Sequence, residues 1–228
     1  MNVKYWCFLS LIPTGFAIAV LVHHTILNIN KENLLLLEGV AFSCGVICVL
    51  VYFMSPVRNW VLWLLAASFI FSIAGDLFLK KRASDIKFTL GIFFFLLAHI
   101  GYFIYAVKNV KFSWPVFTIV TIPYLIFYFT SLLPSSRLKN SGLLAFTVFL
   151  YTIMSCVTFS AAFNPMKNRS VSSWVFAAGI TSLLISDTLI SAGSFLRFRK
   201  LSFLIMPLYY LCHILIVLSV TLKQMYQE

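Results

Sequence analysis

The sequence predicts an all-α integral membrane protein, an eight-helix transmembrane bundle. Three observations support this prediction: 61% of the 228 residues are hydrophobic, only 10% are charged, and the mean hydropathy is +0.99. Soluble domains are about 45–50% apolar and about 25% charged, so a soluble globule of this composition would lack the polar surface to cover itself. The abundance of apolar residues equally excludes a disordered chain.

Eight long apolar runs define the predicted helices, because a helix needs about 20 apolar residues to cross a bilayer. They cover residues 5–29, 34–54, 59–79, 87–107, 113–133, 141–163, 172–195 and 202–222. Lipid admits only helices or closed barrels, and these runs are far too long for strands. The connections are too short to fold separately, so residues 1–228 are predicted to form a single transmembrane domain.

The chain carries a net charge of +11, from 17 Lys and Arg against 6 Asp and Glu. The basic residues lie between the apolar runs, so the expected partner is the anionic headgroup surface of a lipid bilayer rather than a nucleic acid. We expect a multi-pass protein of the bacterial inner membrane. The sequence does not specify an oligomeric state.

The two halves of the chain carry similar polar residues at similar positions. Asp76 and Asp187 lie 111 positions apart, and His99 and His213 lie 114 apart, close to half the chain length of 228. Each Asp falls late in the third helix of a four-helix half, and each His falls midway along the fourth. This pattern allows a parallel internal repeat of residues 1–112 and 113–228.

Asp76 and Asp187 are the acidic residues that need a functional explanation. A charged side chain near the middle of a membrane helix costs about 2.5–3.5 kcal/mol on insertion scales. Two carboxyl groups in one low-dielectric cleft share protons unequally, so one can act as an acid while the other acts as a carboxylate. The pair therefore suits acid–base hydrolysis, as in glycoside cleavage, and it equally suits a proton-coupled small-molecule or lipid transporter.

Histidine and lysine supply further candidates. His99 and His213 lie inside predicted helices, where each either packs as a buried polar group or orients a carboxyl group. No HxxxH pair places two histidines on one helix face, so neither a metal nor another cofactor is expected. Lys80 directly follows the Asp76 helix; it either belongs to an ordinary basic loop or binds a lipid phosphate.

Two segments resemble the signatures of the YhhN-like lysoplasmalogenase family. The first contains Gly75-Asp76 and leads into a helix with His99 and Tyr102 in the order His-x-x-Tyr. The second runs from Gly179 to Ser186-Asp187. The resemblance covers the predicted helices from the third to the eighth, about two-thirds of the chain.

The resemblance implies hydrolysis of the vinyl ether bond of a lysophospholipid, lysoplasmenyl-ethanolamine or lysoplasmenyl-choline, to a fatty aldehyde and a glycerophospho-base. Carried over by position, the catalytic acids are Asp76 and Asp187. Together with the candidates found above, the supporting or substrate-binding residues are expected to be His99, Tyr102, Ser186, His213 and Lys80.

Overall fold

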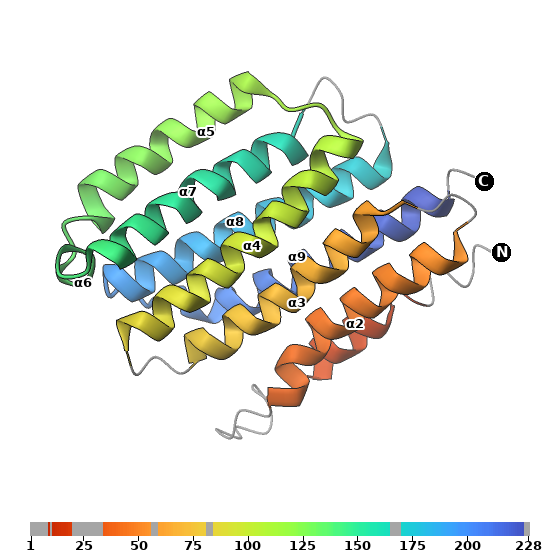
Figure 1. Ribbon diagram of the computed structural model, residues 1–228, viewed down its shortest axis with the longest axis horizontal. Helices are drawn as coiled ribbons and strands as arrows, with labels where there is room; N and C mark the ends of the chain where they lie inside the picture. Colours follow the sequence, from red (N-terminus) through yellow and green to blue (C-terminus); the bar gives the residue numbers. More distant parts are fainter. Residues whose placement is uncertain are drawn as a thin grey trace.

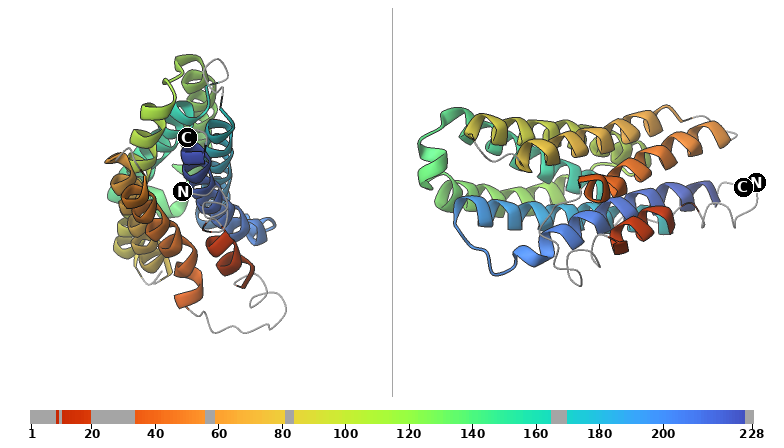
Figure 2. Two further views of the ribbon diagram at one scale, coloured as in Figure 1. Left: turned by 90° about the vertical axis from the view of Figure 1, so that its right-hand side faces the viewer. Right: turned by 90° about the horizontal axis from the view of Figure 1, so that it is seen from below.

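The computed structural model describes residue 9 and residues 11–19, 34–55, 59–80, 84–164 and 170–225. Within these ranges the chain is helical with short connections and contains no strand, so the predicted all-α class is confirmed for this part of the molecule. The long helices run along one axis of an elongated bundle (Figures 1 and 2).

The elements follow one another without any inserted domain among the described residues. They are α2 (Leu34–Met54), α3 (Val61–Lys80), α4 (Asp85–Asn109), α5 (Trp114–Phe127), the π-helical turn η1 (Tyr128–Leu132), α6 (Ser136–Lys139), α7 (Gly142–Ala162), α8 (Val171–Phe195), the 3₁₀ turn η2 (Ser202–Leu204) and α9 (Ile205–Met225).

Six of the described helical segments are long and apolar enough to cross a membrane. They are Val61–Leu79, Asp85–Asn109, Trp114–Leu132, Gly142–Ala162, Val171–Phe195 and Ser202–Met225, and a shorter apolar helix covers Gly39–Met54. These segments fit a multi-pass membrane protein. The first predicted span, residues 5–29, lies largely outside the described residues, with residues 9 and 11–19 helical, so the count of eight stays a prediction.

Serine residues begin several of these helices. The hydroxyl of Ser84 accepts a hydrogen bond from the backbone N–H of Lys87, and Ser141 and Ser170 cap α7 and α8 in the same way. Such a cap satisfies one of the backbone N–H groups that a helix start leaves unpaired. The Ser84 cap starts α4 at Asp85, two residues before the start expected from hydropathy alone.

Glycine allows α3 and α4 to approach each other closely. A Cβ atom added at Gly101 would overlap the Ser68 hydroxyl and lie 2.8 Å from the Leu64 carbonyl oxygen. A Cβ atom at Gly75 would lie 2.7 Å from the ring of Phe95. The α3–α4 contact and the α8–α9 contact are the most extensive in the bundle, and each pair contains one of the two predicted aspartates.

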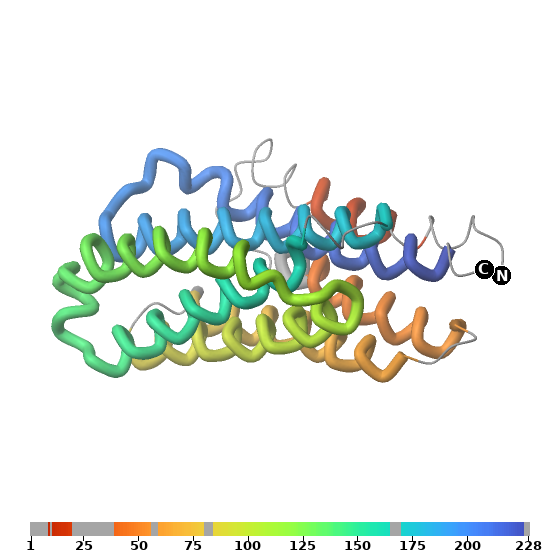
Figure 3. The backbone as a smooth tube through the Cα atoms, turned by 90° about the horizontal axis from the view of Figure 1, so that it is seen from above, coloured from red at the N-terminus to blue at the C-terminus, as the bar shows by residue number. Residues whose placement is uncertain are grey.

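Two hydrophobic clusters form the core. The larger one joins α2, α3, α4, α7, α8 and α9, and the smaller one joins α4, α7 and α8 to η1 and α6. The smaller cluster lies at the end of the bundle where α3 and α8 finish and α4 begins (left in Figure 1). At this end the connection from α8 to α9 swings outward from the bundle (Figure 3). The predicted internal repeat is not tested by this arrangement and stays a prediction.

Candidate active site

Asp187 on α8 is held by two side chains from other helices. The hydroxyl of Tyr151 on α7 donates a hydrogen bond of 2.7 Å to its Oδ2 atom. Nε2 of His99 on α4 lies 3.5 Å from the same oxygen. The Asp187 side chain is only 13% exposed, and its Oδ1 atom makes no hydrogen bond with any residue in the described part of the chain. One carboxylate oxygen is therefore fixed, while the other is open to a ligand.

His99 is 2% exposed and hydrogen-bonded through both ring nitrogens. Its Nε2 lies 3.0 Å from the Tyr151 hydroxyl oxygen, and its Nδ1 lies 3.3 Å from Oγ1 of Thr158. Because Tyr151 gives its only proton to Asp187, its oxygen can only accept from His99, which places a proton on Nε2. A directed chain of hydrogen bonds therefore leads from His99 through Tyr151 to Asp187.

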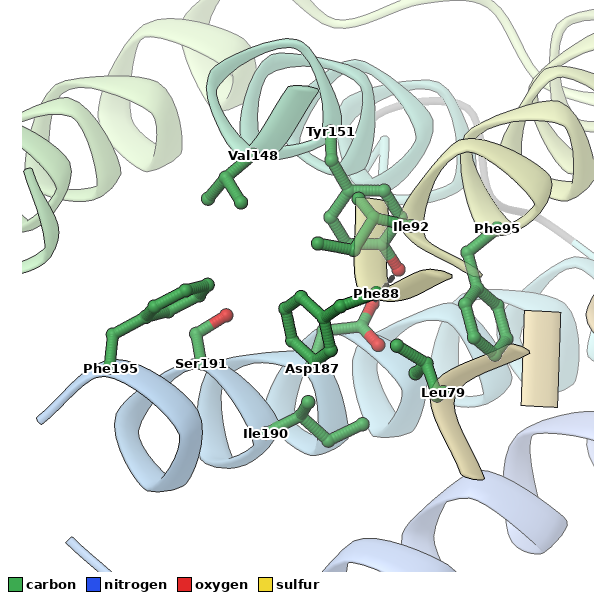
Figure 4. Close-up of a pocket in the computed structure, with 10 residues that line it drawn as sticks. All are labelled: Leu79, Phe88, Ile92, Phe95, Val148, Tyr151, Asp187, Ile190, Ser191 and Phe195. Atoms are coloured by element: carbon green, nitrogen blue, oxygen red, sulfur yellow. Dashed lines mark hydrogen bonds between the residues drawn. The ribbon is translucent and has the colours of Figure 1, made fainter. Parts of the chain in front are cut away.

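An apolar pocket opens beside Asp187 between α3, α4, α7 and α8 (Figure 4). It contains about 420 Å³ of space, part of which is open to the surroundings. Two rings, Phe88 and Phe195, lie toward the end of the bundle where α4 begins, while Tyr151 and Asp187 supply polar groups further in. The full lining is Leu79, Phe88, Ile92, Phe95, Val148, Tyr151, Asp187, Ile190, Ser191 and Phe195.

A second pocket, with about 340 Å³ of space that is partly open to the surroundings, shares Tyr151, Asp187 and Ser191 with the lining of the first. It lies between α5, α7 and α8, and its walls combine apolar side chains with hydroxyl groups. Tyr124 and Thr188 line it and share a hydrogen bond of 2.7 Å. Asp187 thus lines both pockets, which is a suitable position for a group that acts on a long amphipathic ligand.

Asp76 on α3 has a similar partner. The hydroxyl of Tyr209 on α9 donates a hydrogen bond of 2.8 Å to its Oδ2 atom. The ring of His213 packs edge-on against that of Tyr209, with the ring centres 4.4 Å apart, and its Nδ1 donates to the Tyr209 carbonyl oxygen. His99 and Tyr151 also pack edge-on, with ring centres 5.1 Å apart. Each predicted aspartate therefore has a tyrosine donor that contacts one of the predicted histidines.

Phe95 joins the surroundings of the two aspartates. Its ring lies against Gly75, the residue before Asp76, and its centre is 6.1 Å from that of Tyr209. The same ring lines the Asp187 pocket. The Tyr209–Asp76 pair therefore adjoins the wall of this pocket.

The remaining predicted site residues lie around this centre. Tyr102 is buried, shares a hydrogen bond of 3.3 Å with Ser72, and packs its ring edge-on against His99. Ser186 is buried and donates to the backbone carbonyl of Ile205, so in this structure it ties α8 to the start of α9. Lys80 ends α3, and its side chain lies outside the described residues.

Sequence reasoning missed the two tyrosines that bind the aspartates. Tyr151 lies 36 positions from Asp187, and Tyr209 lies 133 positions from Asp76. Both stand in apolar runs and belong to none of the recognised motifs, so no local pattern distinguishes them among the ten tyrosines of the chain. A tyrosine inside an apolar span needs a hydrogen-bond partner, and this was the available signal.

The comparison with protein families gives one match, in which residues 39–220 fit the model of the YhhN family. This family includes lysoplasmalogenases. No similar relative was found among curated proteins or solved structures. The match runs from within α2 to within α9 and includes both aspartates, both histidines and both tyrosine partners. The chain belongs to the YhhN family, as its two aspartate signatures predicted.

Proposed function

We propose that the protein is a lysoplasmalogenase, a membrane hydrolase that cleaves the vinyl ether bond of a lysophospholipid. The products would be a fatty aldehyde and a glycerophospho-base. The observation that carries this proposal is the Asp187 carboxylate, which Tyr151 and His99 orient and which lines two pockets. Membership of a family that includes lysoplasmalogenases supports the choice of substrate.

The reaction begins with protonation of the vinyl ether at its β-carbon, which leaves an oxocarbenium ion. Water then adds to the α-carbon, and the resulting hemiacetal separates into aldehyde and alcohol. These steps need a protonated acid and a carboxylate that stabilises positive charge and accepts a proton from water. We assign the acid to Asp76 and the carboxylate to Asp187.

The hydrogen bonds around Asp187 support this assignment. Tyr151 donates to Oδ2 while its own oxygen accepts from His99, which leaves Oδ1 to face the oxocarbenium ion or the attacking water. Because the carboxylate is held before substrate arrives, little reorganisation is needed during the reaction. Asp76, beside the shared Phe95 wall, would deliver the first proton.

The pocket walls suit an amphipathic substrate. Phe88, Ile92 and Phe195 give one pocket an apolar lining, and Phe127 and Leu184 contribute to the other. Ligand sites that bind amphipathic molecules combine apolar walls with a few placed polar groups. The hydroxyl groups of Ser191 and Thr188, close to Asp187 in sequence, would support the attacking water.

Aldehyde release by the purified protein in detergent tests the proposal, with lysoplasmenylethanolamine as substrate. Asp76→Asn and Asp187→Asn should each lower the rate by about 100-fold or more, the range that acid–base catalysis contributes. Glu228→Gln makes the same chemical change at the last residue of the chain and should leave the rate unchanged. Wild-type rates in both aspartate variants would overturn the proposal.

A transporter would give a different result in the same preparation. Reconstituted in liposomes, it would move a solute in response to a pH gradient and release no aldehyde. Mass spectrometry of the lipid products would also separate vinyl ether cleavage from hydrolysis of another lipid bond.

A further inference from the structure

Arg137 packs against Phe88, one of the residues that line the Asp187 pocket, and the proposed mechanism does not use it. It belongs to the short helix α6, at the end of the bundle where α4 begins (Figure 1). Its Nε donates a hydrogen bond of 2.8 Å to Oδ1 of Asp85. Its Cζ atom lies 4.0 Å from the centre of the Phe88 ring, and Phe88 lines the pocket. A guanidinium group therefore lies against a lining residue of the pocket, at the end of the bundle where α4 begins.

We propose that Arg137 binds the phosphate group of a lysophospholipid, and that Asp85 pairs with the guanidinium when no phosphate is present. The inference deepens the proposed function, on which it rests for the position of the vinyl ether bond. It adds a phosphate site from a residue that belongs to none of the predicted motifs.

The chemistry of the group fits a phosphodiester. A guanidinium carries five N–H donors in a planar fork that matches two phosphate oxygens at once. Contact with the Phe88 ring holds the plane of the fork in place. Both the charge and its orientation are thus set before a ligand arrives.

A phosphate group can replace Asp85 as the partner of Arg137. The Asp85 side chain is 50% exposed and that of Arg137 is 27% exposed. Exposed ion pairs of this kind contribute little net stability, because water competes for both charges. An incoming phosphate can therefore replace the Asp85 carboxylate at small cost, and it offers more acceptor oxygens to the guanidinium.

The spacing along α8 agrees with a lysophospholipid. Phe195 follows Asp187 by eight residues, which places it about 12 Å further along the helix. Its ring centre lies 5.9 Å from that of Phe88, beneath the guanidinium. A glycerol unit and its ester oxygen separate the vinyl ether from the phosphate and span about half of this distance when extended. The phosphate would therefore lie between Asp187 and the two rings, and the guanidinium would reach toward it over Phe88. The tail would then continue past Asp187 into the second pocket.

If the Arg137–Asp85 ion pair were purely structural, substitutions of its two residues would have effects on binding that differ from those at a phosphate site. If the pair only held α6 against α4, removal of either partner would have the same effect on every ligand. If Arg137 instead binds phosphate in competition with Asp85, the two substitutions act in opposite directions, and only on ligands that carry phosphate.

The test measures equilibrium binding to the full-length protein in detergent of two saturated ether lipids that vinyl ether chemistry cannot cleave. One is 1-O-alkyl-lysophosphoethanolamine, and the other is the matching 1-O-alkylglycerol. Arg137→Gln should weaken binding of the phospholipid by about tenfold or more, leaving the alkylglycerol unaffected. Asp85→Asn should tighten binding of the phospholipid severalfold. Lys139→Gln removes the same charge from an exposed position on the same helix and should change neither.

Two further measurements complete the test. Arg137→Lys keeps the charge but loses the planar fork, so it should bind the phospholipid with intermediate affinity. It replaces Arg137→Gln in the test if that variant fails to fold. Inorganic phosphate should compete only at far higher concentration than the lipid, which identifies a lipid rather than free phosphate as the ligand.

Equal losses for both ligands in the Arg137 and Asp85 variants would overturn the inference. If the protein releases no aldehyde but binding still depends on Arg137, the phosphate site stands while the proposed function fails.

Discussion

The hydroxyl of Tyr151 donates a 2.7 Å hydrogen bond to Asp187 and lies 3.0 Å from a ring nitrogen of His99. One tyrosine thereby links a histidine on α4 to a carboxylate on α8. Tyr209 holds Asp76 at 2.8 Å in the same manner. The bundle excludes charge from most of its interior. By donating hydrogen bonds, these tyrosines lower the free-energy cost of burying two aspartates there.

Tyr151→Phe should lower the turnover number for aldehyde release by about 10- to 100-fold, the effect of losing a hydrogen bond to a charged group. The ring would remain in place, so folding should change little. Kinetic measurement of kcat and KM together tests this, because a group that orients Asp187 should affect kcat more than KM.

The matched control for this variant is Tyr128→Phe. Tyr128 is buried and donates a 2.8 Å hydrogen bond to the Ala145 carbonyl, away from both aspartates. Tyr128→Phe removes a comparable hydrogen bond and should leave aldehyde release unchanged. If the two phenylalanine variants showed equal kcat values, Tyr151 would have no role in positioning Asp187.

Tyr209→Phe tests the second tyrosine. It removes one hydrogen bond to Oδ2 of Asp76, which weakens the orientation of the carboxyl group that proton transfer needs. We expect kcat to fall by about tenfold or more, and a double variant with Asp76→Asn should be no slower than Asp76→Asn alone. An additive loss in the double variant would show that Tyr209 acts independently of Asp76.

The helices themselves were largely predictable from local sequence. The run at residues 34–54 coincides with α2, and the run at 172–195 differs from α8 by one residue. Apolar length and serine caps are local signals, so they can be found without knowledge of the fold. The run at 113–133 was expected to be one helix, but it changes at Tyr128 into a π-helical turn that follows Pro123. A proline removes a backbone donor and disturbs the regular ladder, but it does not specify how the chain continues.

The site was only partly predictable. The aspartates and histidines stood out because charged and polar groups are rare in the predicted spans. The contact between His99 and Asp187 joins residues that are 88 positions apart, and it depends on how α4, α7 and α8 pack. Arg137 could not be assigned from sequence, since its relation to the pocket arises only from the contact between α6 and Phe88.

Gly101→Ala should destabilise the protein by about 1–3 kcal/mol, the usual penalty for overpacking. The added methyl group would meet the Ser68 side chain and the Leu64 backbone carbonyl, and the carbonyl cannot move without displacing α3. Apparent melting temperature in detergent is the measurement. Gly142→Ala is the control, because a Cβ atom there meets nothing within 4 Å. Alanine has a higher helix propensity than glycine at both positions, so the two variants differ in what the added methyl group contacts. Equal melting temperatures would therefore show that the α3–α4 contact can relax.

Ser191→Leu should change the preference for tail length. Ser191 lines both pockets where they meet at Asp187, so a larger apolar side chain there narrows the path between them. Long alkenyl chains must extend through this junction, whereas short chains need not. We therefore expect kcat/KM to fall further for long-chain than for short-chain lysoplasmalogens, by at least about tenfold, in line with the 1–3 kcal/mol that overpacking costs.

Ser194→Leu is the control, because it introduces the same side chain three residues later on α8, and Ser194 contributes to neither pocket lining among the described residues. Ser191→Ala removes the hydroxyl beside the attacking water without adding bulk, so it should lower kcat/KM equally for all chain lengths. The same chain-length dependence in Ser191→Leu and Ser191→Ala would place the tail elsewhere in the bundle.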